Sequence, residues 1–410
     1  MSKKKEIVIV AYQFCPRGRI GTRRWSKFAK YLSKDYRVHI ICAKYPYKDR
    51  LNWCADVENN ENIIIHRIST LYPSFAIQEK RTIIVKAVCY LLNVYPFYKD
   101  EAQYWKRSLF KKLDEIRTDN KISHFFVTGA PFTPLYYMSM YKKKHPSINL
   151  ILDLRDPWMQ ILKKKYNFFG KLKSQVETRD ELKSFEVADK ILFVTKTFTK
   201  EYKQVYPKLA YKMFTVYNGF DEEDFVNIKP SDEENKIAYA GALFEGRAEG
   251  MLLFIKAIQA QNIKTNLSCE VDIYSNQIDE KFKIEISQNY SSFVSFKKPL
   301  PQNELFSELK RYKYLITINE MIKPYAFGTK IFEYIALGKK IVLISPEGEL
   351  YRLLIDQKQF VSTYDEQNIL KMVSELFRDF EDNFIVTPQS LYNSFELKTL
   401  TSSLFLDLND

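Results

Sequence analysis

The sequence is poor in the side chains that bind metals. Its 410 residues include only four histidines and five cysteines, and no two cysteines form a CxxC pair: Cys15, Cys42, Cys54, Cys89 and Cys269. Zinc sites need closely spaced histidine and cysteine ligands, so we expect no metal. Scattered cysteines in odd number are typical of a reducing compartment rather than of a disulfide scaffold. A cytoplasmic protein is therefore expected.

Long apolar runs are missing as well. No stretch reaches the roughly 20 apolar residues that a membrane-spanning helix needs. The first strand is expected to begin at Glu6, so no signal peptide is predicted. The chain is nevertheless 46% hydrophobic and 15% aromatic, which is enough apolar surface for roughly two or three folded domains.

Acidic residues are outnumbered by basic ones, 50 to 63, and the net charge is +13. This excess fits a solvated lysine-rich surface or an anionic partner such as phosphates, nucleic acid or a membrane face. Nucleic acid is the weakest of these, because the sequence has no zinc knuckle, RNA-recognition signature or basic zipper. Residues 81–98 and 163–173 mix lysines with apolar or aromatic residues and favour contact with an anionic membrane. A buried helix and a solvated loop are the respective alternatives.

Glycine is scarce, and its eleven positions mark the joints of the chain. Short apolar runs at 6–14, 123–127, 213–217 and 236–240 each precede a glycine. Such runs suit strands that are buried on both faces of a parallel sheet. Glycine at their carboxyl ends lets the backbone turn tightly or approach a ligand closely.

Helical patterns alternate with these strands. Residues 22–35 place four apolar side chains on one helical face, with Thr22 as the expected N-cap. The order strand, glycine loop, helix begins at residue 6 and again at residue 236, on either side of an acidic linker, 221–235. The pattern predicts an α/β protein with two doubly wound parallel sheets facing a cleft, and ligands beyond the carboxyl ends of the strands.

The stretch "PYAFGTKIFEYIALGKKIV" predicts an anion site at the start of a helix. We expect the helix to begin near Gly328 and to end with Gly338 as its C′ residue. Its first N–H groups and its dipole favour an anion, and Gly328, Thr329 and Lys330 would hold a diphosphate. Glu333, one turn later, suits the hydroxyls of a ribose. The alternative is an exposed Lys–Glu pair.

A second stretch, "CPRGRIGTRRW", places two glycines and four arginines between a strand and a helix. It lacks the GxGxxG spacing, and no acidic residue closes the second strand, so nicotinamide chemistry is weakly supported. A phosphate loop and a basic surface loop both fit this composition.

Two further strand ends carry charged residues. In "LILDLRDPW", Asp153 falls within the strand and is expected to be structural, whereas Asp156 is expected in the cleft as the catalytic carboxylate; an ion network is the alternative. In "IAYAGALFEGR", a strand ends at Gly241, and Arg247 is expected to reach the same phosphate as Lys330. A surface arginine is the alternative there.

Taken together, these stretches resemble the GT-B glycosyltransferases of the group 1 (family 4) class over nearly the whole chain. The resemblance is carried by "FCPRGRIGTRRWSKFAKYL", "TGAPFTP", "DLRDPW", "ADKILFVT", "YNGFDEEDF", "YAGALFEGR" and "GTKIFEYIALGKKIV". It implies two Rossmann-like domains, a nucleotide-activated sugar as donor, and no metal or other cofactor.

The resemblance also implies residue roles. Gly18, Gly21 and Arg24 would form the acceptor-side loop. Arg247 and Lys330 would bind the donor diphosphate, with Gly241 in the same donor site. Glu333 would be the second glutamate of the family's E-x7-E pattern, which holds the ribose. The first glutamate would fall at Tyr325, and its absence leaves the donor sugar and a retaining mechanism open.

The resulting prediction is a metal-independent, hexosyltransferase-like enzyme on the inner face of the cell membrane. It would transfer a sugar to a glycan or lipid-linked acceptor in cell-envelope polysaccharide synthesis. The predicted domains are residues 1–220 for the acceptor, 221–390 for the nucleotide sugar, and a final helix in 391–410 that returns to the first domain. A nucleotide-sugar epimerase on the same fold and a non-catalytic anion-binding protein are the alternatives.

Overall fold

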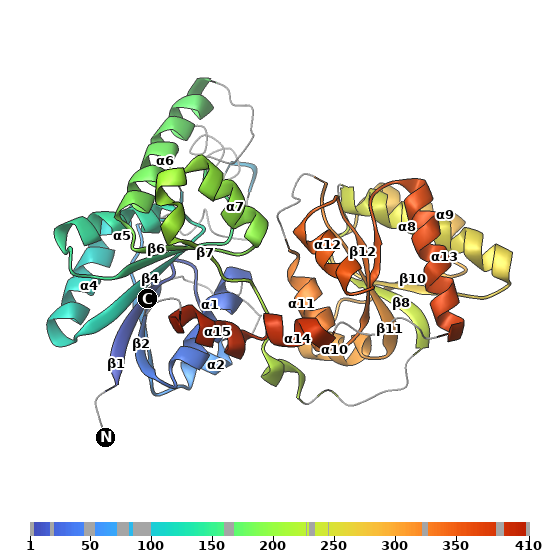
Figure 1. Ribbon diagram of the computed structural model, residues 1–410, viewed down its shortest axis with the longest axis horizontal. Helices are drawn as coiled ribbons and strands as arrows, with labels where there is room; N and C mark the ends of the chain where they lie inside the picture. Colours follow the sequence, from blue (N-terminus) through green and yellow to red (C-terminus); the bar gives the residue numbers. More distant parts are fainter. Residues whose placement is uncertain are drawn as a thin grey trace. The chain divides into compact units, whose positions relative to one another are not determined.

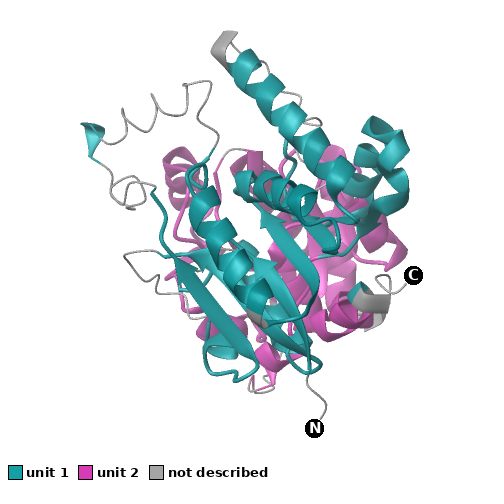
Figure 2. Ribbon diagram, turned by 90° about the vertical axis from the view of Figure 1, so that its left-hand side faces the viewer, with its two compact units in different colours: residues 1–217, 404–410 teal, residues 218–403 magenta. Residues whose placement is uncertain are grey.

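The computed structural model describes the chain in two compact units. The described residues are 4–16, 20–44, 54–71, 82–84, 100–159, 168–226, 228, 234–244, 246–321, 327–382 and 389–406. One unit comprises Met1–Tyr217 and Leu404–Asp410, and the other Asn218–Ser403 (Figure 2). Each unit is a parallel sheet with helices around it (Figure 1), so the prediction of two doubly wound α/β domains is confirmed.

The first unit contains a seven-stranded sheet in the order β3-β2-β1-β4-β5-β6-β7, and every neighbouring pair is parallel. The strands are β1 (Lys5–Val10), β2 (Tyr36–Ala43), β3 (Ile63–Ile68), β4 (Ile122–Gly129), β5 (Leu150–Leu154), β6 (Lys190–Phe193) and β7 (Met213–Thr215). The strand order reverses at β1 and β4, where open α/β sheets bind ligands beyond the strand ends.

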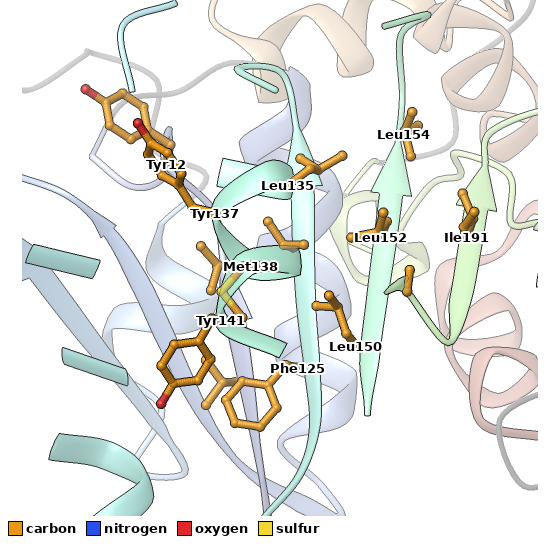
Figure 3. Packing of buried hydrophobic residues seen from close by; sticks show 14 of the residues in the cluster. Tyr12, Phe125, Leu135, Tyr137, Met138, Tyr141, Leu150, Leu152, Leu154 and Ile191 are labelled. Atoms are coloured by element: carbon orange, nitrogen blue, oxygen red, sulfur yellow. The ribbon is translucent and has the colours of Figure 1, made fainter. Parts of the chain in front are cut away.

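Helices of the first unit pack their apolar faces on this sheet. They are α1 (Ile20–Leu32), α2 (Ala55–Glu58), α4 (Lys106–Asp119), α5 (Thr133–Lys144), α6 (Phe168–Val187), α7 (Lys196–Val205) and the 3-10 helix η2 (Pro207–Lys212). Leu135, Met138 and Tyr141 of α5 belong to the same buried cluster as Phe125 of β4 and Leu150 of β5 (Figure 3).

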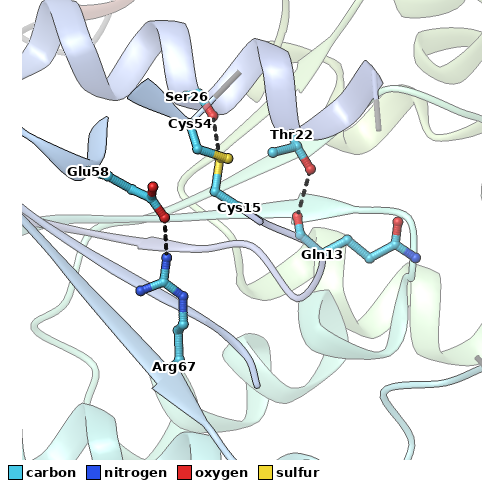
Figure 4. The surroundings of a disulfide bond; sticks show 7 residues. All are labelled: Gln13, Cys15, Thr22, Ser26, Cys54, Glu58 and Arg67. Carbon is cyan, nitrogen blue, oxygen red and sulfur yellow. Dashed lines mark hydrogen bonds and ion pairs between the residues drawn. A yellow bond between two sulfur atoms is a disulfide. The ribbon is translucent and has the colours of Figure 1, made fainter. Parts of the chain in front are cut away.

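Helix α1 begins earlier than expected. It starts at Ile20, so the prediction that Thr22 is its N-cap is wrong. Thr22 lies in the first turn instead, and its hydroxyl donates to the Gln13 carbonyl at 3.4 Å (Figure 4). The apolar face is as predicted, since Trp25 and Phe28 are fully buried.

Two cysteines of this unit are paired, contrary to the expectation from their spacing. A disulfide joins Cys15, which follows β1, to Cys54, which precedes α2, with the two Cα atoms 5.5 Å apart (Figure 4). Cys42 and Cys269 are free and buried, and Cys89 lies outside the described residues. The partners are 39 residues apart in the sequence, and helices α1 and α2 beside them are in contact.

The second unit contains a six-stranded parallel sheet in the order β10-β9-β8-β11-β12-β13. Its strands are β8 (Glu234–Ala240), β9 (Val271–Tyr274), β10 (Val294–Lys297), β11 (Tyr312–Ile318), β12 (Lys340–Ile344) and β13 (Phe360–Ser362). The predicted linker 221–235 contains a 3-10 helix, η3 (Glu222–Phe225), and its last two residues belong to β8.

The helices that follow these strands are α8 (Gly246–Thr265), α9 (Glu280–Asn289), α10 (Gln302–Leu309), α11 (Thr329–Ala336), α12 (Glu349–Asp356) and α13 (Glu366–Asp382). The single final helix expected in 391–410 is two helices in the described residues, α14 (Gln389–Phe395) and α15 (Leu397–Leu406). The break falls at Glu396, whose carboxylate accepts bonds from the N–H groups of Lys398 and Thr399 at 2.9 and 2.8 Å. Glu396 thus caps the N-terminus of α15.

Among the described residues, no helix combines the length and apolarity needed to cross a membrane. Most of the two stretches expected at a membrane surface, 81–98 and 163–173, lies outside the described residues. Membrane contact therefore stays a prediction.

Candidate functional site

The predicted anion site lies at the start of α11, just beyond the carboxyl end of β11. Gly328 is the N-cap residue, with an extended backbone (φ −61°, ψ 140°) and no side-chain cap. A Cβ added at Gly328 would meet, among the described residues, only the Asn319 side-chain oxygen, at 3.7 Å. Among the described residues, no side chain caps the first N–H groups of α11, where Thr329 begins the helix, and such groups can donate hydrogen bonds to an anion.

The buried face and the C-terminus of α11 are both well defined. Ile331 and Ile335 are 1% and 2% exposed. Gly338 has φ +65° and is the C′ residue, as predicted. Its N–H donates to the Ile335 carbonyl at 3.0 Å, and the Lys339 N–H donates to the Tyr334 carbonyl at 3.1 Å. These two bonds form a Schellman motif, which stops the helix at a defined residue.

Lys330 and Glu333 form an ion pair of 2.9 Å on the first turns of α11. The alternative of an exposed pair is wrong for the glutamate, because its side chain is only 4% exposed while that of Lys330 is 32% exposed. Gln302, the first residue of α10, covers the carboxylate and donates to it at 3.4 Å. The structure thus places a buried carboxylate behind a partly exposed cation.

Arg247, on the first turn of α8, lies at the same edge of this sheet. Its guanidinium contacts the Glu320 carboxylate at 2.7 Å, and the two side chains are 30% and 10% exposed. Glu320 comes two residues after β11 and is not among the predicted site residues. A cation and a carboxylate 73 residues apart carry no local sequence signal for such a pair.

Tyr364 and Gly241 also lie beyond the carboxyl ends of strands in the second unit's sheet. The Tyr364 hydroxyl, beyond β13, donates to the Asn319 carbonyl at 2.5 Å. Burial raises the pKa of Tyr364 to about 12, while nearby Arg247 lowers it and Glu320 raises it. Gly241, beyond β8, has φ +157°, where other residues are rarely found. The structure therefore gathers the six predicted donor-site residues beyond β8 and β11 of one sheet; their donor role stays a prediction.

The two aspartates of "LILDLRDPW", Asp153 and Asp156, differ in burial. Asp153 in β5 is 0% exposed. It accepts bonds from Arg24 Nη2 at 3.0 Å, Trp25 Nε1 at 2.7 Å and Thr128 Oγ1 at 2.9 Å. Asp156, at the carboxyl end of the same strand, is exposed. The burial of Asp153 agrees with its predicted structural role, whereas the place of Asp156 in a cleft and its catalytic role stay predictions.

Arg24 was predicted on the acceptor-side loop, and the structure places it inside the unit. It is 4% exposed. Besides the Asp153 bond, its guanidinium donates to the Val216 and Tyr217 carbonyls at 2.9 and 2.7 Å. Its charge thus ties α1 to β5 and to the chain after β7. Contact with an acceptor stays a prediction, and Gly18 lies outside the described residues.

Gly21 is needed for the position of Arg155. A Cβ at Gly21 would lie 1.8 Å from Nη1 of Arg155. The Arg155 guanidinium donates to Thr128 Oγ1 at 3.2 Å and to the Ala130 carbonyl at 3.3 Å. Burial lowers the pKa of Arg155, and the charges of Asp153 and Asp156 oppose that effect. Gly21 therefore makes room for a half-buried cation beside the carboxyl ends of β4 and β5.

A cavity of about 130 Å³ is lined in part by Ala130, whose carbonyl accepts a bond from Arg155, and the sequence did not predict it. Its walls include Asp100, Phe132, Tyr136, Trp158 and Glu177. The Phe132 and Trp158 rings stack with centroids 5.3 Å apart. Asp100 accepts the N–H of Phe132 at 2.9 Å, and burial raises its pKa. Aromatic faces beside carboxylates suit a sugar ring, which has both apolar faces and hydroxyl donors.

No protein-family model and no curated protein matches the sequence. Solved structures match nearly the whole chain. Sucrose-phosphate synthase from Thermosynechococcus elongatus has a TM-score of 0.65 at 9% identity, covering 99% of this chain and 98% of that chain. A UDP-forming α,α-trehalose-phosphate synthase from Burkholderia vietnamiensis has a TM-score of 0.64 at 10% identity, covering 99% and 100%. Anabaena HepE in complex with UDP and glucose has a TM-score of 0.58 at 12% identity, covering 99% of each. The chain therefore has the GT-B fold of these proteins, as the resemblance implied.

Proposed function

We propose that this protein is a glycosyltransferase that moves a sugar from a nucleotide diphosphate donor to a glycan or lipid-linked acceptor. The observation that carries the proposal is the edge of the second sheet, where Arg247 and Lys330 flank a helix N-terminus left uncapped at Gly328. The shared fold supports it, since one of the similar proteins is in complex with UDP and glucose. The proposed roles of these residues follow from their chemistry.

The diphosphate would lie on the first N–H groups of α11 with Arg247 and Lys330 on either side. Negative charge grows on the diphosphate as the bond to the sugar breaks, and fixed cations and N–H dipoles stabilise it. Loss of one such group typically costs about a hundredfold to a thousandfold in rate. We propose that these groups make a metal unnecessary. Glu333 would accept hydrogen bonds from the ribose hydroxyls.

The acceptor would bind the first unit. Asp156 is the exposed carboxylate proposed to bind or activate the acceptor hydroxyl as a general base. The cavity between Phe132, Trp158 and Glu177 would hold an acceptor sugar ring. The net charge of +13 supports peripheral association with an anionic membrane. The proposed place of the reaction is cell-envelope polysaccharide synthesis. A retaining outcome depends on groups around Tyr325, which lies outside the described residues.

A donor screen followed by a transfer assay tests the proposal. Binding to the folded state alone raises its stability by about 2.7 kcal/mol when the ligand is at a hundred times its Kd. A nucleotide sugar that raises the melting temperature is then incubated with candidate glycan acceptors, and release of nucleoside diphosphate is measured. Donor consumption without an acceptor product would indicate an epimerase, and binding without turnover would indicate a non-catalytic protein.

A further inference from the structure

We propose that the second unit binds a sugar residue in a hollow on one face of its sheet, apart from the predicted donor site. The hollow has a volume of about 210 Å³. Its walls include Asp272, Tyr274, Lys297, Glu308, Arg311 and Tyr312. The proposal goes beyond the proposed function, because this site would hold a glycan and take no part in the transfer reaction.

The polar face of two neighbouring strands creates the hollow. In β9, Val271 and Ile273 belong to the apolar cluster of the second unit, so Asp272 and Tyr274 point to the opposite face of the sheet. Lys297 is paired with Tyr274 in the neighbouring strand β10 and shares that face. Parallel strands that are covered by helices on both faces are apolar throughout. This alternation therefore indicates a face with a polar role.

The hollow is separate from the residues predicted to bind the donor. Tyr312 is the first residue of β11, and Lys236, which also lines the hollow, is the third residue of β8. Gly328 and Arg247 come after the carboxyl ends of the same two strands. A ligand in the hollow would therefore leave the carboxyl ends of β8 and β11 accessible.

Buried hydroxyl groups form the floor of the hollow. Tyr312 donates its hydroxyl proton to Asp272 Oδ2 at 2.5 Å, and its oxygen is 3.0 Å from the Tyr274 hydroxyl. Because Tyr312 has only one hydroxyl proton, Tyr274 must be the donor in the second bond. Burial raises the pKa of both tyrosines, so both stay protonated at neutral pH. The Tyr274 oxygen thus keeps its capacity to accept a hydrogen bond from a ligand.

Exposed charged groups form the rim. Lys297 is 41% exposed and contacts Asp272 Oδ1 at 3.1 Å. An ammonium group has three N–H donors, so Lys297 can keep this contact and also donate to a ligand. Glu308 is exposed as well, and its oxygen is 3.7 Å from Arg311, which is longer than a hydrogen bond. The rim therefore offers both a donor and an acceptor.

This combination favours a sugar over an anion. Three cations and three carboxylates line or adjoin the hollow: Lys236, Lys297, Arg311, Asp272, Glu308 and Glu270, which pairs with Lys236. Their charges sum to zero, so the hollow has no net attraction for a phosphate. Sugar hydroxyls both donate and accept, and the C–H faces of a sugar pack on aromatic rings. The volume is below the roughly 300–1,000 Å³ of pockets for drug-sized ligands, which fits a single sugar residue.

Two substitutions separate this site from the rest of the protein. Lys297→Gln removes the ammonium group at an exposed position, and Tyr274→Phe removes the acceptor oxygen while the ring stays. Each should lower sugar affinity by about tenfold, the effect of one lost hydrogen bond to a charged or buried group. Lys298→Gln is the matched control, because Lys298 is exposed and does not line the hollow.

Ligand-observed NMR titration of the full-length protein tests the proposal, because it detects weak binding. The probes are the methyl glycosides of glucose, galactose, mannose and N-acetylglucosamine. Binding of at least one probe that weakens in Lys297→Gln and Tyr274→Phe but not in Lys298→Gln, at unchanged melting temperatures, supports the site. Failure of the wild type to bind any probe overturns it, and so does undiminished binding by Lys297→Gln, which would place the sugar elsewhere. Neither failure affects the proposed transfer reaction, which Lys297→Gln should catalyse at the wild-type rate.

Discussion

Replacing Asp153 by asparagine should destabilise the first unit by about 3–5 kcal/mol. The carboxylate is fully buried and accepts three bonds, from Arg24 on Oδ1 and from Trp25 and Thr128 on Oδ2. An asparagine amide has only one oxygen. If that oxygen faces Trp25 and Thr128, its NH₂ group faces the Arg24 guanidinium, and a buried cation loses its counterion.

The loss should fall near the lower end of that range, about 3 kcal/mol. Arg24 keeps its bonds to the carbonyls of Val216 and Tyr217, and these partly stabilise the cation. Asp156→Asn removes the same charge three residues away at an exposed position, and should change stability by less than about 0.5 kcal/mol. Arg24→Met combined with Asp153→Asn removes both charges and should recover part of the loss.

Urea denaturation followed by tryptophan fluorescence measures this effect in the first unit alone. All four tryptophans of the chain, Trp25, Trp53, Trp105 and Trp158, belong to Met1–Tyr217. A loss below about 1 kcal/mol for Asp153→Asn would mean that the Arg24 network does not hold this unit together, and would refute the reasoning.

Three further predictions use the same protein. Reduction of the Cys15–Cys54 bond, whose partners are 39 residues apart, should lower the stability of the first unit by about 4 kcal/mol, and Cys54→Ser should unfold at the same urea concentration with or without reductant. Burial, with His39 and Lys112, lowers the pKa of His66 from 6.5 to about 4; the unfolded chain then binds the extra proton between these values, so stability should fall as pH drops from 6.5 to 4, and less steeply in His66→Gln. Sugar transfer should survive EDTA, and activity lost on chelation and restored by magnesium or manganese would contradict metal independence.

The sequence pattern predicted where several strands lie, because a strand's apolar run and the glycine that follows it are close together in the sequence. Apolar runs followed by glycine correctly marked β1, β4 and β8, and Gly338 marked the end of α11. These signals depend on residues within one turn or one strand of each other.

The partners of the charged residues could not be predicted in the same way. Glu333 is buried and accepts a bond from Gln302 of another helix, and Glu320 contacts Arg247 from 73 residues away. Arg24, which the resemblance assigned to the acceptor-side loop, lies inside the unit on α1 and bonds Asp153 of β5. Each of these outcomes depends on which helix packs where, and no short stretch of sequence contains that information.

The central claim is that the start of α11 binds the donor diphosphate, and the most direct test is calorimetric titration of Gly328→Val with UDP or ADP, whichever binds the wild type. Valine fits the backbone at φ −61° and ψ 140°, and its Cβ would meet only Asn319 at 3.7 Å among the described residues. The melting temperature should therefore stay within a few degrees of the wild type, while diphosphate affinity falls at least about a hundredfold, because the side chain occupies the space in front of the first N–H groups. A Gly328→Val protein that binds the diphosphate as tightly as the wild type would contradict the account.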